Sequence, residues 1–165
     1  MERPIEARVG ELLRRHGLSL ALAESCTGGL LAHRLTDVAG SSDYFLGGIV
    51  AYSNTVKQGL LGVRPETLRA EGAVSRKTAL EMARGARLAL GADLGLAVTG
   101  IAGPGGALPE KPVGLTWIAL CGPTQEQARE FRWRGDRRLN KSQSAQAALE
   151  ILLEYLEKLS PRAVG

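Results

Sequence analysis

Three side chains that can attack a carbonyl carbon, Ser25, Cys26 and Thr27, stand in a row within the segment LAESCTGGLLAHRL (22–35). A glycine pair and an apolar, helix-like stretch follow them. Unpaired N–H groups at a helix N-terminus carry partial positive charge, which suits an anion or a developing oxyanion, and glycine lets a ligand approach the backbone closely. The segment is therefore a candidate catalytic loop, and the alternative is a plain helix cap by Ser25 or Thr27.

A serine nucleophile needs a base, because its free hydroxyl is barely ionised at neutral pH. The two histidines, His16 and His33, do not follow predicted strands, and both are expected at the surface. Lys57 comes just after a predicted strand, and desolvation can turn a lysine into a base that replaces histidine as the partner of a serine. We take Ser25 and Lys57 as the candidate pair, with Tyr52 bridging the proton transfer or positioning the substrate. The alternatives are an exposed helical lysine and a strand-end core tyrosine.

A third unusual segment, TGIAGPGG (99–106), also follows a predicted strand. It contains neither the GxxxxGK[ST] phosphate loop nor GxGxxG, so a triphosphate or dinucleotide fingerprint is absent. Ligands of open α/β sheets bind outside the carboxyl ends of the parallel strands, and we expect the three segments to converge there. Thr99 is expected to point into the same cleft, and a plain glycine-rich turn is the alternative.

The elements that must position these segments follow from hydrophobic periodicity. Apolar residues at helical spacing and flanking caps predict a first helix, a helix after the glycine pair, two helices in the middle of the chain and a long final helix. The ranges are 3–16 for the first helix, a start after Gly28 for the second, starts near Thr55 and after Ser75 for the middle pair, and about 139–159 for the last. The predicted strands cover 18–25, 43–54, 94–100, 113–122 and 128–135. A short polar loop joins the last two strands, which predicts an antiparallel pair. The pattern implies an α/β fold, a three-layer α/β/α sandwich with a mixed, mostly parallel five-stranded sheet.

Length and composition predict one domain over residues 1–165 in a cytoplasmic protein. The chain has 165 residues, a 44% apolar share and two cysteines without metal-ligand spacing, and no apolar run approaches the roughly 18 residues of a membrane span. We expect no membrane association, no metal and no cofactor. The net charge of +4 favours an anionic partner, and much of the excess lies in 129–141, either a solvated strand edge or a binding patch. Aromatic residues make up 4% of the chain, which makes nucleic acid an unlikely partner.

Five motifs that follow one another along the chain resemble the C-terminal domain of the CinA family: ESCTGG, LGGIVAYSNTVKQGLLGV, GAVS, TGIAGPGG and KPVG. The resemblance covers about residues 5–157 and implies the same sandwich fold. It also implies hydrolysis of the carboxamide of nicotinamide mononucleotide to nicotinate mononucleotide and ammonia, and a homodimer. Many relatives carry a further N-terminal domain of a molybdopterin-binding type, and nothing of that type precedes Met1, so we expect a stand-alone amidase or a shortened form of the longer protein.

The resemblance assigns Ser25 as the nucleophile and gives Lys57, Tyr52 and Thr99 to the site. The expected substrate-binding residues are Glu24, Thr27, Gly28, Gly29, Asn54, Thr99, Gly100, Ala102, Gly103, Gly105 and Arg137. Glu24 either balances the pyridinium charge of the substrate or is buried against a backbone N–H. Family members often carry a basic residue four positions after Arg137, commonly arginine, and here it is Lys141, which keeps the charge and loses bidentate geometry.

The mechanism that these assignments predict starts with a neutral Lys57, which takes the proton of Ser25. Backbone N–H groups around Thr27, Gly28 and Gly29 then hold the oxyanion. Cys26 remains a rival nucleophile, because a thiol at a helix N-terminus can ionise readily. The competing class of function is a non-catalytic module, either a nucleotide sensor or a nucleic-acid binder linked to competence or DNA damage.

Overall fold

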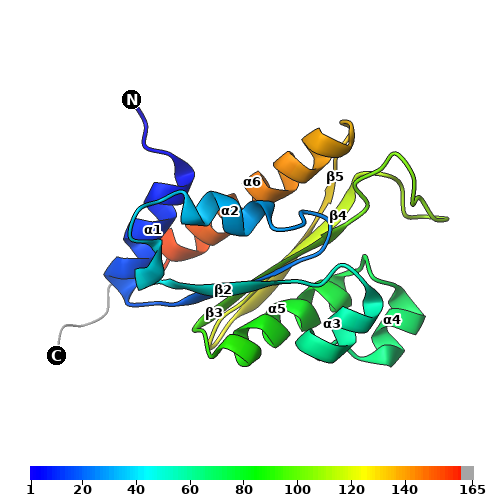
Figure 1. The fold of residues 1–165 in the computed structure, drawn as a ribbon, viewed down its shortest axis with the longest axis horizontal. Coiled ribbons are helices and arrows are strands. Elements are labelled where there is room, and N and C mark those ends of the chain that lie inside the picture. The colour runs from blue at the N-terminus through cyan, green and yellow to red at the C-terminus, as the bar shows by residue number, and fades with distance from the viewer. Residues whose placement is uncertain (161–165) are drawn as a thin grey trace.

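The computed structural model of the protein describes residues 1–160, in which one five-stranded sheet has helices on both faces (Figure 1). The strands are β1 (Leu20–Glu24), β2 (Phe45–Val50), β3 (Leu94–Gly100), β4 (Leu115–Cys121) and β5 (Glu126–Arg132). The helices are α1 (Ile5–His16), α2 (Leu30–Thr36), α3 (Asn54–Leu61), α4 (Pro65–Glu71), α5 (Arg76–Leu90) and α6 (Arg137–Glu157), with a 3-10 turn η1 (Ser41–Asp43).

The sheet has the order β2-β1-β3-β4-β5, and four of its five strands run in one direction. β1 pairs in parallel with both β2 and β3, whereas β4 is antiparallel to both of its neighbours. The predicted three-layer fold with a mixed, mostly parallel sheet is confirmed. Because β2, β1 and β3 are adjacent and parallel, their carboxyl ends meet at one edge, which is where the three unusual segments begin.

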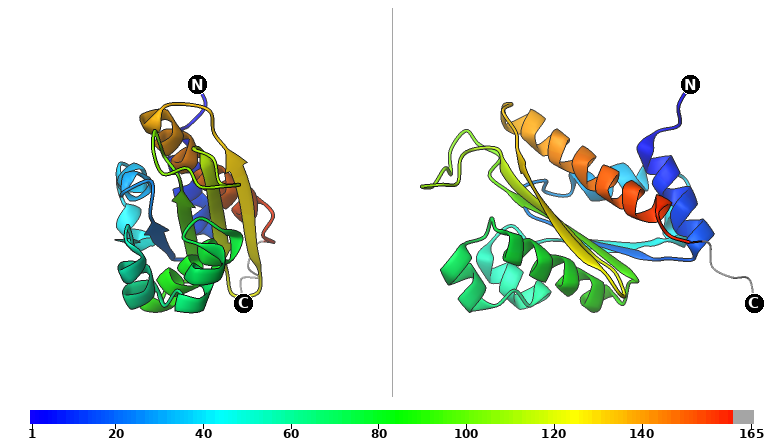
Figure 2. Two further views of the ribbon diagram at one scale, coloured as in Figure 1. Left: turned by 90° about the vertical axis from the view of Figure 1, so that its right-hand side faces the viewer. Right: turned by 180° about the vertical axis from the view of Figure 1, so that it is seen from behind.

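Two apolar layers hold the helices to the sheet, α1, α2 and α6 on one face and α3, α4 and α5 on the other (Figure 2). Alternate residues of a strand point to opposite faces: in β1, Leu20 and Leu22 face the first layer, and Ala21 and Ala23 face the second. The small side chains of the second face let α5 come close to the sheet. At Gly95 an added Cβ would collide with the backbone of α5.

The main differences from the sequence-based expectation are one helix and the limits of two strands. α4 was not predicted, because Leu68 is its one large apolar residue and no helical period appears. β2 ends at Val50, before the predicted limit of 54. β5 begins at Glu126 and ends at Arg132, each ahead of the predicted limits of 128 and 135. The structure describes no residue of the segment 161–165, so the predicted single domain is described over 1–160.

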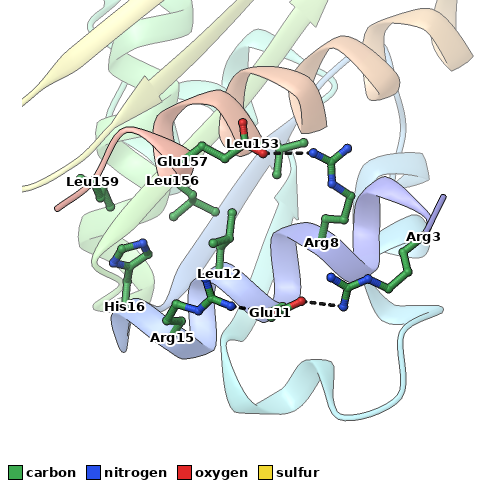
Figure 3. Close-up of a pocket in the computed structure, with 10 residues that line it drawn as sticks. All are labelled: Arg3, Arg8, Glu11, Leu12, Arg15, His16, Leu153, Leu156, Glu157 and Leu159. Atoms are coloured by element: carbon green, nitrogen blue, oxygen red, sulfur yellow. Dashed lines mark hydrogen bonds and ion pairs between the residues drawn. The ribbon is translucent and has the colours of Figure 1, made fainter. Parts of the chain in front are cut away.

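His16 is a correction, because it is buried and not at the surface as expected. It ends α1, and Gly17 then turns the chain back with a φ of 63°. The side chain lies in the hollow between α1 and the C-terminal end of α6 (Figure 3). The side chain of His33 is exposed, as predicted. None of the helices in residues 1–160 is long and apolar enough to cross a bilayer.

Candidate active site

A pocket of about 190 Å³ lies at the edge of the sheet where β1, β2 and β3 end. The segments after these strands supply most of its wall, as the sequence predicted, and the loop before α5 and the first turn of α6 supply the rest. The lining residues are Ser25, Cys26, Tyr52, Lys57, Ala73, Val74, Thr99, Gly100, Ala102 and Arg137. The pocket therefore joins parts of the chain that are far apart in sequence.

Ser25 and Lys57 are in direct contact at the floor of this pocket. The Nζ atom of Lys57 lies 3.0 Å from Ser25 Oγ, and it is also 2.7 Å from the carbonyl oxygen of Ala51 and 3.2 Å from that of Tyr52. The side chain of Lys57 is 1% exposed. Its position is set by the start of α3, where Ser53 Oγ accepts a hydrogen bond from the N–H of Val56 at 3.1 Å.

Burial lowers the pKa of the Lys57 ammonium group, because the low-dielectric surroundings disfavour its charge. The three polar neighbours of Nζ are all uncharged groups. A neutral amine has two N–H donors and one lone pair. It can donate to the carbonyls of Ala51 and Tyr52 and still accept the hydroxyl proton of Ser25. The arrangement suits a lysine that acts as a base.

The backbone around Ser25 turns sharply after β1. The Ser25 N–H donates to the Val98 carbonyl of β3 at 2.9 Å, and the Ser25 carbonyl accepts from the N–H of Gly28 at 3.1 Å. Gly28 and Gly29 have φ values of 59° and 102°, a region that favours glycine. The N–H of Gly28 thus already donates a hydrogen bond within the protein. The N–H groups of Thr27 and Gly29 have no acceptor within residues 1–160, which leaves them as candidate oxyanion donors.

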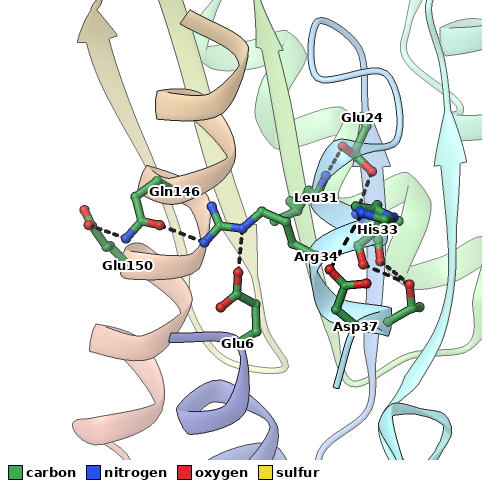
Figure 4. A network of polar contacts seen from close by, with 10 residues as sticks. Glu6, Glu24, Leu31, His33, Arg34, Asp37, Gln146 and Glu150 are labelled. Atoms are coloured by element: carbon green, nitrogen blue, oxygen red, sulfur yellow. Dashed lines mark hydrogen bonds and ion pairs between the residues drawn. The ribbon is translucent and has the colours of Figure 1, made fainter. Parts of the chain in front are cut away.

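Glu24 is buried, with 1% of its surface exposed, and it caps helix α2 (Figure 4). Its two carboxylate oxygens accept hydrogen bonds from the N–H of Leu31 at 2.9 Å and of Ala32 at 3.1 Å. It is not among the residues that line the pocket. Of the two interpretations of Glu24, the structure favours burial against backbone N–H groups.

Cys26 lines the pocket, but its environment disfavours a thiolate. The side chain is buried, and desolvation raises the pKa of the thiol to about 12. A thiol with such a pKa stays protonated at neutral pH and is a weak nucleophile. Thr27 is also buried, and its Oγ1 has no hydrogen-bond partner within residues 1–160. It does not line the pocket.

Tyr52 and Arg137 meet at the rim. Arg137 Nη2 donates to the Tyr52 hydroxyl at 3.1 Å, and Nη1 donates to the carbonyl of Gly103 at 2.7 Å. Tyr52 is 63% exposed. Since Ser25 and Lys57 touch directly, the Tyr52 hydroxyl does not lie between them, and it is the main-chain carbonyl of Tyr52 that contacts the lysine.

The remaining predicted residues fall into two groups. Thr99 and Gly100 line the pocket, as does Ala102, and the Thr99 hydroxyl donates to the Ala73 carbonyl at 2.8 Å, which ties β3 to the loop before α5. Asn54 is exposed at the start of α3 and does not line the pocket. The glycines at 28, 29, 103 and 105 belong to the surrounding loops rather than to the lining.

The sequence analysis missed three residues that shape the site. Ala73 and Val74 line the pocket; the motif GAVS contained them, but nothing in their apolar side chains indicated a role. Asn140 in α6 donates to the carbonyl of Ala102. Nothing in its spacing distinguished it from the rest of the basic segment, so only the tertiary structure identified it.

Four of the six cations of the basic segment form ion pairs or lie near the pocket. Arg129 pairs with Glu154 at 2.7 Å and Arg132 with Glu130 at 2.6 Å, which makes that part a solvated strand edge. Lys141 lies by the loop between β1 and α2, since its Nζ is 3.8 Å from the position that a Cβ at residue 28 would take.

A second hollow of about 510 Å³ lies between α1 and the end of α6 (Figure 3). Figure 1 places α1 at the end of the sheet opposite to α3. The charged residues that line this hollow pair with one another, Arg3 with Glu11 at 2.6 Å and Arg8 with Glu157 at 3.0 Å. Within residues 1–160 no cluster of His, Cys, Asp or Glu could hold a metal ion. The pocket around Ser25 is therefore the candidate active site.

Comparisons with known proteins agree with this fold. A crystal structure of a CinA superfamily protein from Klebsiella pneumoniae superposes with a TM-score of 0.91 and 35% identity, over 94% of this chain and 97% of that one. The structure of the competence/damage inducible protein CihA from Agrobacterium tumefaciens gives a TM-score of 0.87 and 42% identity, over 96% of this chain and all of that one.

Sequence relatives point the same way. A putative competence-damage inducible protein of Moorella thermoacetica is 53% identical over 152 residues, which are 92% of this chain and 37% of that protein. A CinA-like protein of Salinibacter ruber is 49% identical over 146 residues, 88% of this chain and 35% of the relative. This chain thus spans little more than a third of the length of these relatives. The model of the CinA C-terminal domain matches residues 2–156, and the chain belongs to the CinA family.

Proposed function

We propose that the protein hydrolyses the carboxamide of nicotinamide mononucleotide, with Ser25 as the nucleophile and Lys57 as the base, and releases nicotinate mononucleotide and ammonia. The observation that carries the proposal is the 3.0 Å contact between Ser25 Oγ and the Nζ of a fully buried lysine. Burial lowers the pKa of Lys57, which raises the share of neutral amine that can accept a proton.

The first half of the reaction forms an acyl-enzyme. Neutral Lys57 takes the hydroxyl proton directly as Ser25 Oγ attacks the amide carbon. The N–H groups of Thr27 and Gly29, which have no acceptor within residues 1–160, are the candidate donors to the oxyanion. One such donor typically lowers the barrier by about 3–4 kcal/mol. The C–N bond then breaks, and the leaving amide nitrogen takes the proton from Lys57 to depart as ammonia.

The second half restores the enzyme. Water attacks the acyl carbon, and Lys57 accepts one of its protons. The ester bond to Ser25 breaks, Oγ takes the proton back from Lys57, and nicotinate mononucleotide leaves. One water is consumed and one ammonia is formed, and no redox partner or metal enters these steps.

The pocket supports a substrate with a small planar amide and a larger anionic part. A volume of about 190 Å³ suits a pyridine carboxamide ring but not the whole nucleotide. Ribose and phosphate would therefore lie outside, at the rim. Arg137 lines that rim, and Lys141 lies beside the catalytic loop. Both offer positive charge to a phosphate.

The test is the release of ammonia from nicotinamide mononucleotide by the wild type and by the variants Ser25→Ala and Lys57→Ala. The matched control is Lys77→Ala, because Lys77 is an exposed lysine of α5 outside the pocket. We expect both active-site variants to lose at least about a thousandfold in turnover and the control to retain wild-type activity.

Other outcomes would assign the chain to the competing class. Binding of the mononucleotide without ammonia release, by the wild type as well as by the variants, would indicate a nucleotide sensor. Binding of DNA or RNA whose affinity falls steeply with salt, without nucleotide turnover, would indicate a nucleic-acid binder. The names of the relatives from Moorella thermoacetica and Agrobacterium tumefaciens associate those proteins with competence and damage.

A further inference from the structure

We propose that Asn140 is a positioning residue, which holds the loop after β3 in its pocket-forming shape when the substrate draws Arg137 away from that loop. The inference rests on the proposed function, in which Arg137 meets the phosphate. Asn140 lies in the basic segment 129–141 but was not itself a candidate site residue, and its side chain is 2% exposed.

The loop between Ile101 and Leu108 has few internal supports. Its ends are paired, since Ile101 exchanges main-chain hydrogen bonds with Gly114 and Leu115, and Leu108 pairs with Lys111. Between these ends, and within residues 1–160, the main chain makes hydrogen bonds at two carbonyls only, those of residues 102 and 103. The shape of this loop thus depends on the groups that meet those carbonyls.

Both groups come from the first turn of α6. Asp136 caps that helix by accepting from the N–H of Leu139 at 2.9 Å, which fixes where it begins. Residues three apart then lie on one helical face. Arg137 Nη1 donates to the Gly103 carbonyl at 2.7 Å, and Asn140 Nδ2 donates to the Ala102 carbonyl at 3.0 Å.

The two contacts differ in what else each side chain can do. Arg137 is exposed at the rim and also holds the Tyr52 hydroxyl, so an anionic substrate can recruit it. Asn140 is uncharged and buried, and it has no attraction for a phosphate. When Arg137 turns to the substrate, Asn140 remains as the contact that keeps Ala102 in the pocket wall.

The Asn140 amide is fixed at both of its ends. Its Oδ1 accepts from the N–H of Gly135 at 3.0 Å, so its Nδ2 must face the Ala102 carbonyl, and a flipped amide would place donor against donor. The main-chain carbonyl of Asn140 accepts a hydrogen bond from Ser144 Oγ at 2.7 Å, and that hydroxyl in turn accepts from Trp133 Nε1 at 2.9 Å. The amide is therefore held rigidly and can position the loop.

The experiment compares Asn140→Leu, Asn140→Asp and the control Gln146→Leu. Leucine keeps the branched shape and the number of heavy atoms and removes both hydrogen bonds. An ionised aspartate keeps the shape but turns an acceptor toward the Ala102 carbonyl. Gln146 is an amide of the same helix that bonds to Arg34 and Glu150, away from the loop, so its loss reports on general destabilisation.

The first readout needs no enzymatic activity. Hydrogen exchange of the bonded amides at the loop ends, those of Ile101, Leu108 and Gly114, should become faster in Asn140→Leu. Exchange in β1 and α5 should stay as in the wild type. Gln146→Leu should leave exchange in the loop unchanged. If the wild type proves to have no amidase activity, the proposed function fails, and this measurement still decides whether Asn140 positions the loop.

The second readout is the split between KM and kcat. We expect Asn140→Leu to lower kcat/KM about tenfold, chiefly through KM, as for the loss of one hydrogen bond, because the contact between Ser25 and Lys57 is untouched. Asn140→Asp should recover relative to the wild type as the pH falls toward the pKa of its carboxyl group, since a protonated carboxyl can again donate to the carbonyl of Ala102. Unchanged exchange of the amides of Ile101, Leu108 and Gly114, or unchanged KM, or loss of folding in both variants, overturns the proposal.

Discussion

Replacing Glu24 with glutamine is expected to destabilise the fold with little effect on the chemistry. The two carboxylate oxygens accept from the N–H groups of Leu31 and Ala32, at 2.9 and 3.1 Å. A glutamine side chain has one acceptor oxygen, and its NH₂ group would face an N–H donor. The change removes one hydrogen bond to a charged group, about 1.5–3 kcal/mol, and the attraction of a carboxylate for a helix N-terminus, about 1 kcal/mol in this setting.

The sum is about 3 kcal/mol of lost stability, which corresponds to a decrease of roughly 6–12 °C in the melting temperature for a domain of this size. Urea unfolding at neutral pH, followed by circular dichroism, measures it, and the slope of the transition should stay unchanged. Glu150→Gln is the matched control. Glu150 is an exposed carboxylate of α6 that bonds to Gln146 (Figure 4), and we expect an effect below about 0.5 kcal/mol.

The kinetic measurement separates the two interpretations of Glu24. If Glu24 is a helix cap, the Glu24→Gln variant should turn over nicotinamide mononucleotide with nearly the wild-type KM at a temperature where both proteins are folded. A protein with unchanged unfolding but a strongly raised KM would refute the reasoning and make Glu24 the counter-charge of the pyridinium ring.

Three further predictions concern the pocket. The stability of the wild type relative to Lys57→Met should increase as the pH rises. Burial lowers the pKa of Lys57 in the folded state. Between that lowered pKa and the unfolded value of about 10.4, the unfolded chain therefore binds one more proton than the folded one, and a rise in pH favours folding. Unfolding titrations at several pH values measure this difference, and a constant difference would contradict a lowered pKa. Cys26→Ala should retain most of the ammonia release, because burial raises the pKa of its thiol to about 12 and keeps it protonated; abolished turnover would make Cys26 the nucleophile. Gly100→Ala should lower stability by about 1–3 kcal/mol, because the added Cβ would lie 2.6 Å from Thr116 Oγ1 and 3.0 Å from the Leu115 carbonyl oxygen; an unfolding midpoint equal to that of the wild type would contradict this packing.

Local patterns were sufficient to predict the layers and the place of the site. All five strands were predicted, and β3 was predicted with its observed limits. The cap at Ser53 could be identified from residue type alone, and it placed Lys57 in the helix after β2. Strand ends in a parallel sheet must share an edge, so convergence of the three segments followed from topology.

The features that the sequence did not predict depend on contacts between segments that are far apart in the sequence. Glu24 belongs to the motif ESCTGG, which suggested a role in the site, but only the packing of α2 shows that its carboxylate accepts a hydrogen bond from the N–H of Leu31. His16 was expected at the surface, and its burial depends on how the end of α6 packs against α1. A residue type limits what a side chain can do, and its neighbours decide which of these possibilities is realised.

The sequence alone determined the fold class and the edge of the sheet where the three unusual segments meet, because strand and helix periodicity are local properties. It also supplied Ser25 and Lys57 as the candidate pair. The tertiary structure decided that Ser25 and Lys57, 32 positions apart, touch, that the lysine is buried and that Asn140 reaches the loop after β3. The physical reason is that a pKa and a hydrogen bond depend on which atoms surround a group in space. Those atoms come from segments far apart in the sequence, and local patterns do not give the distances between them.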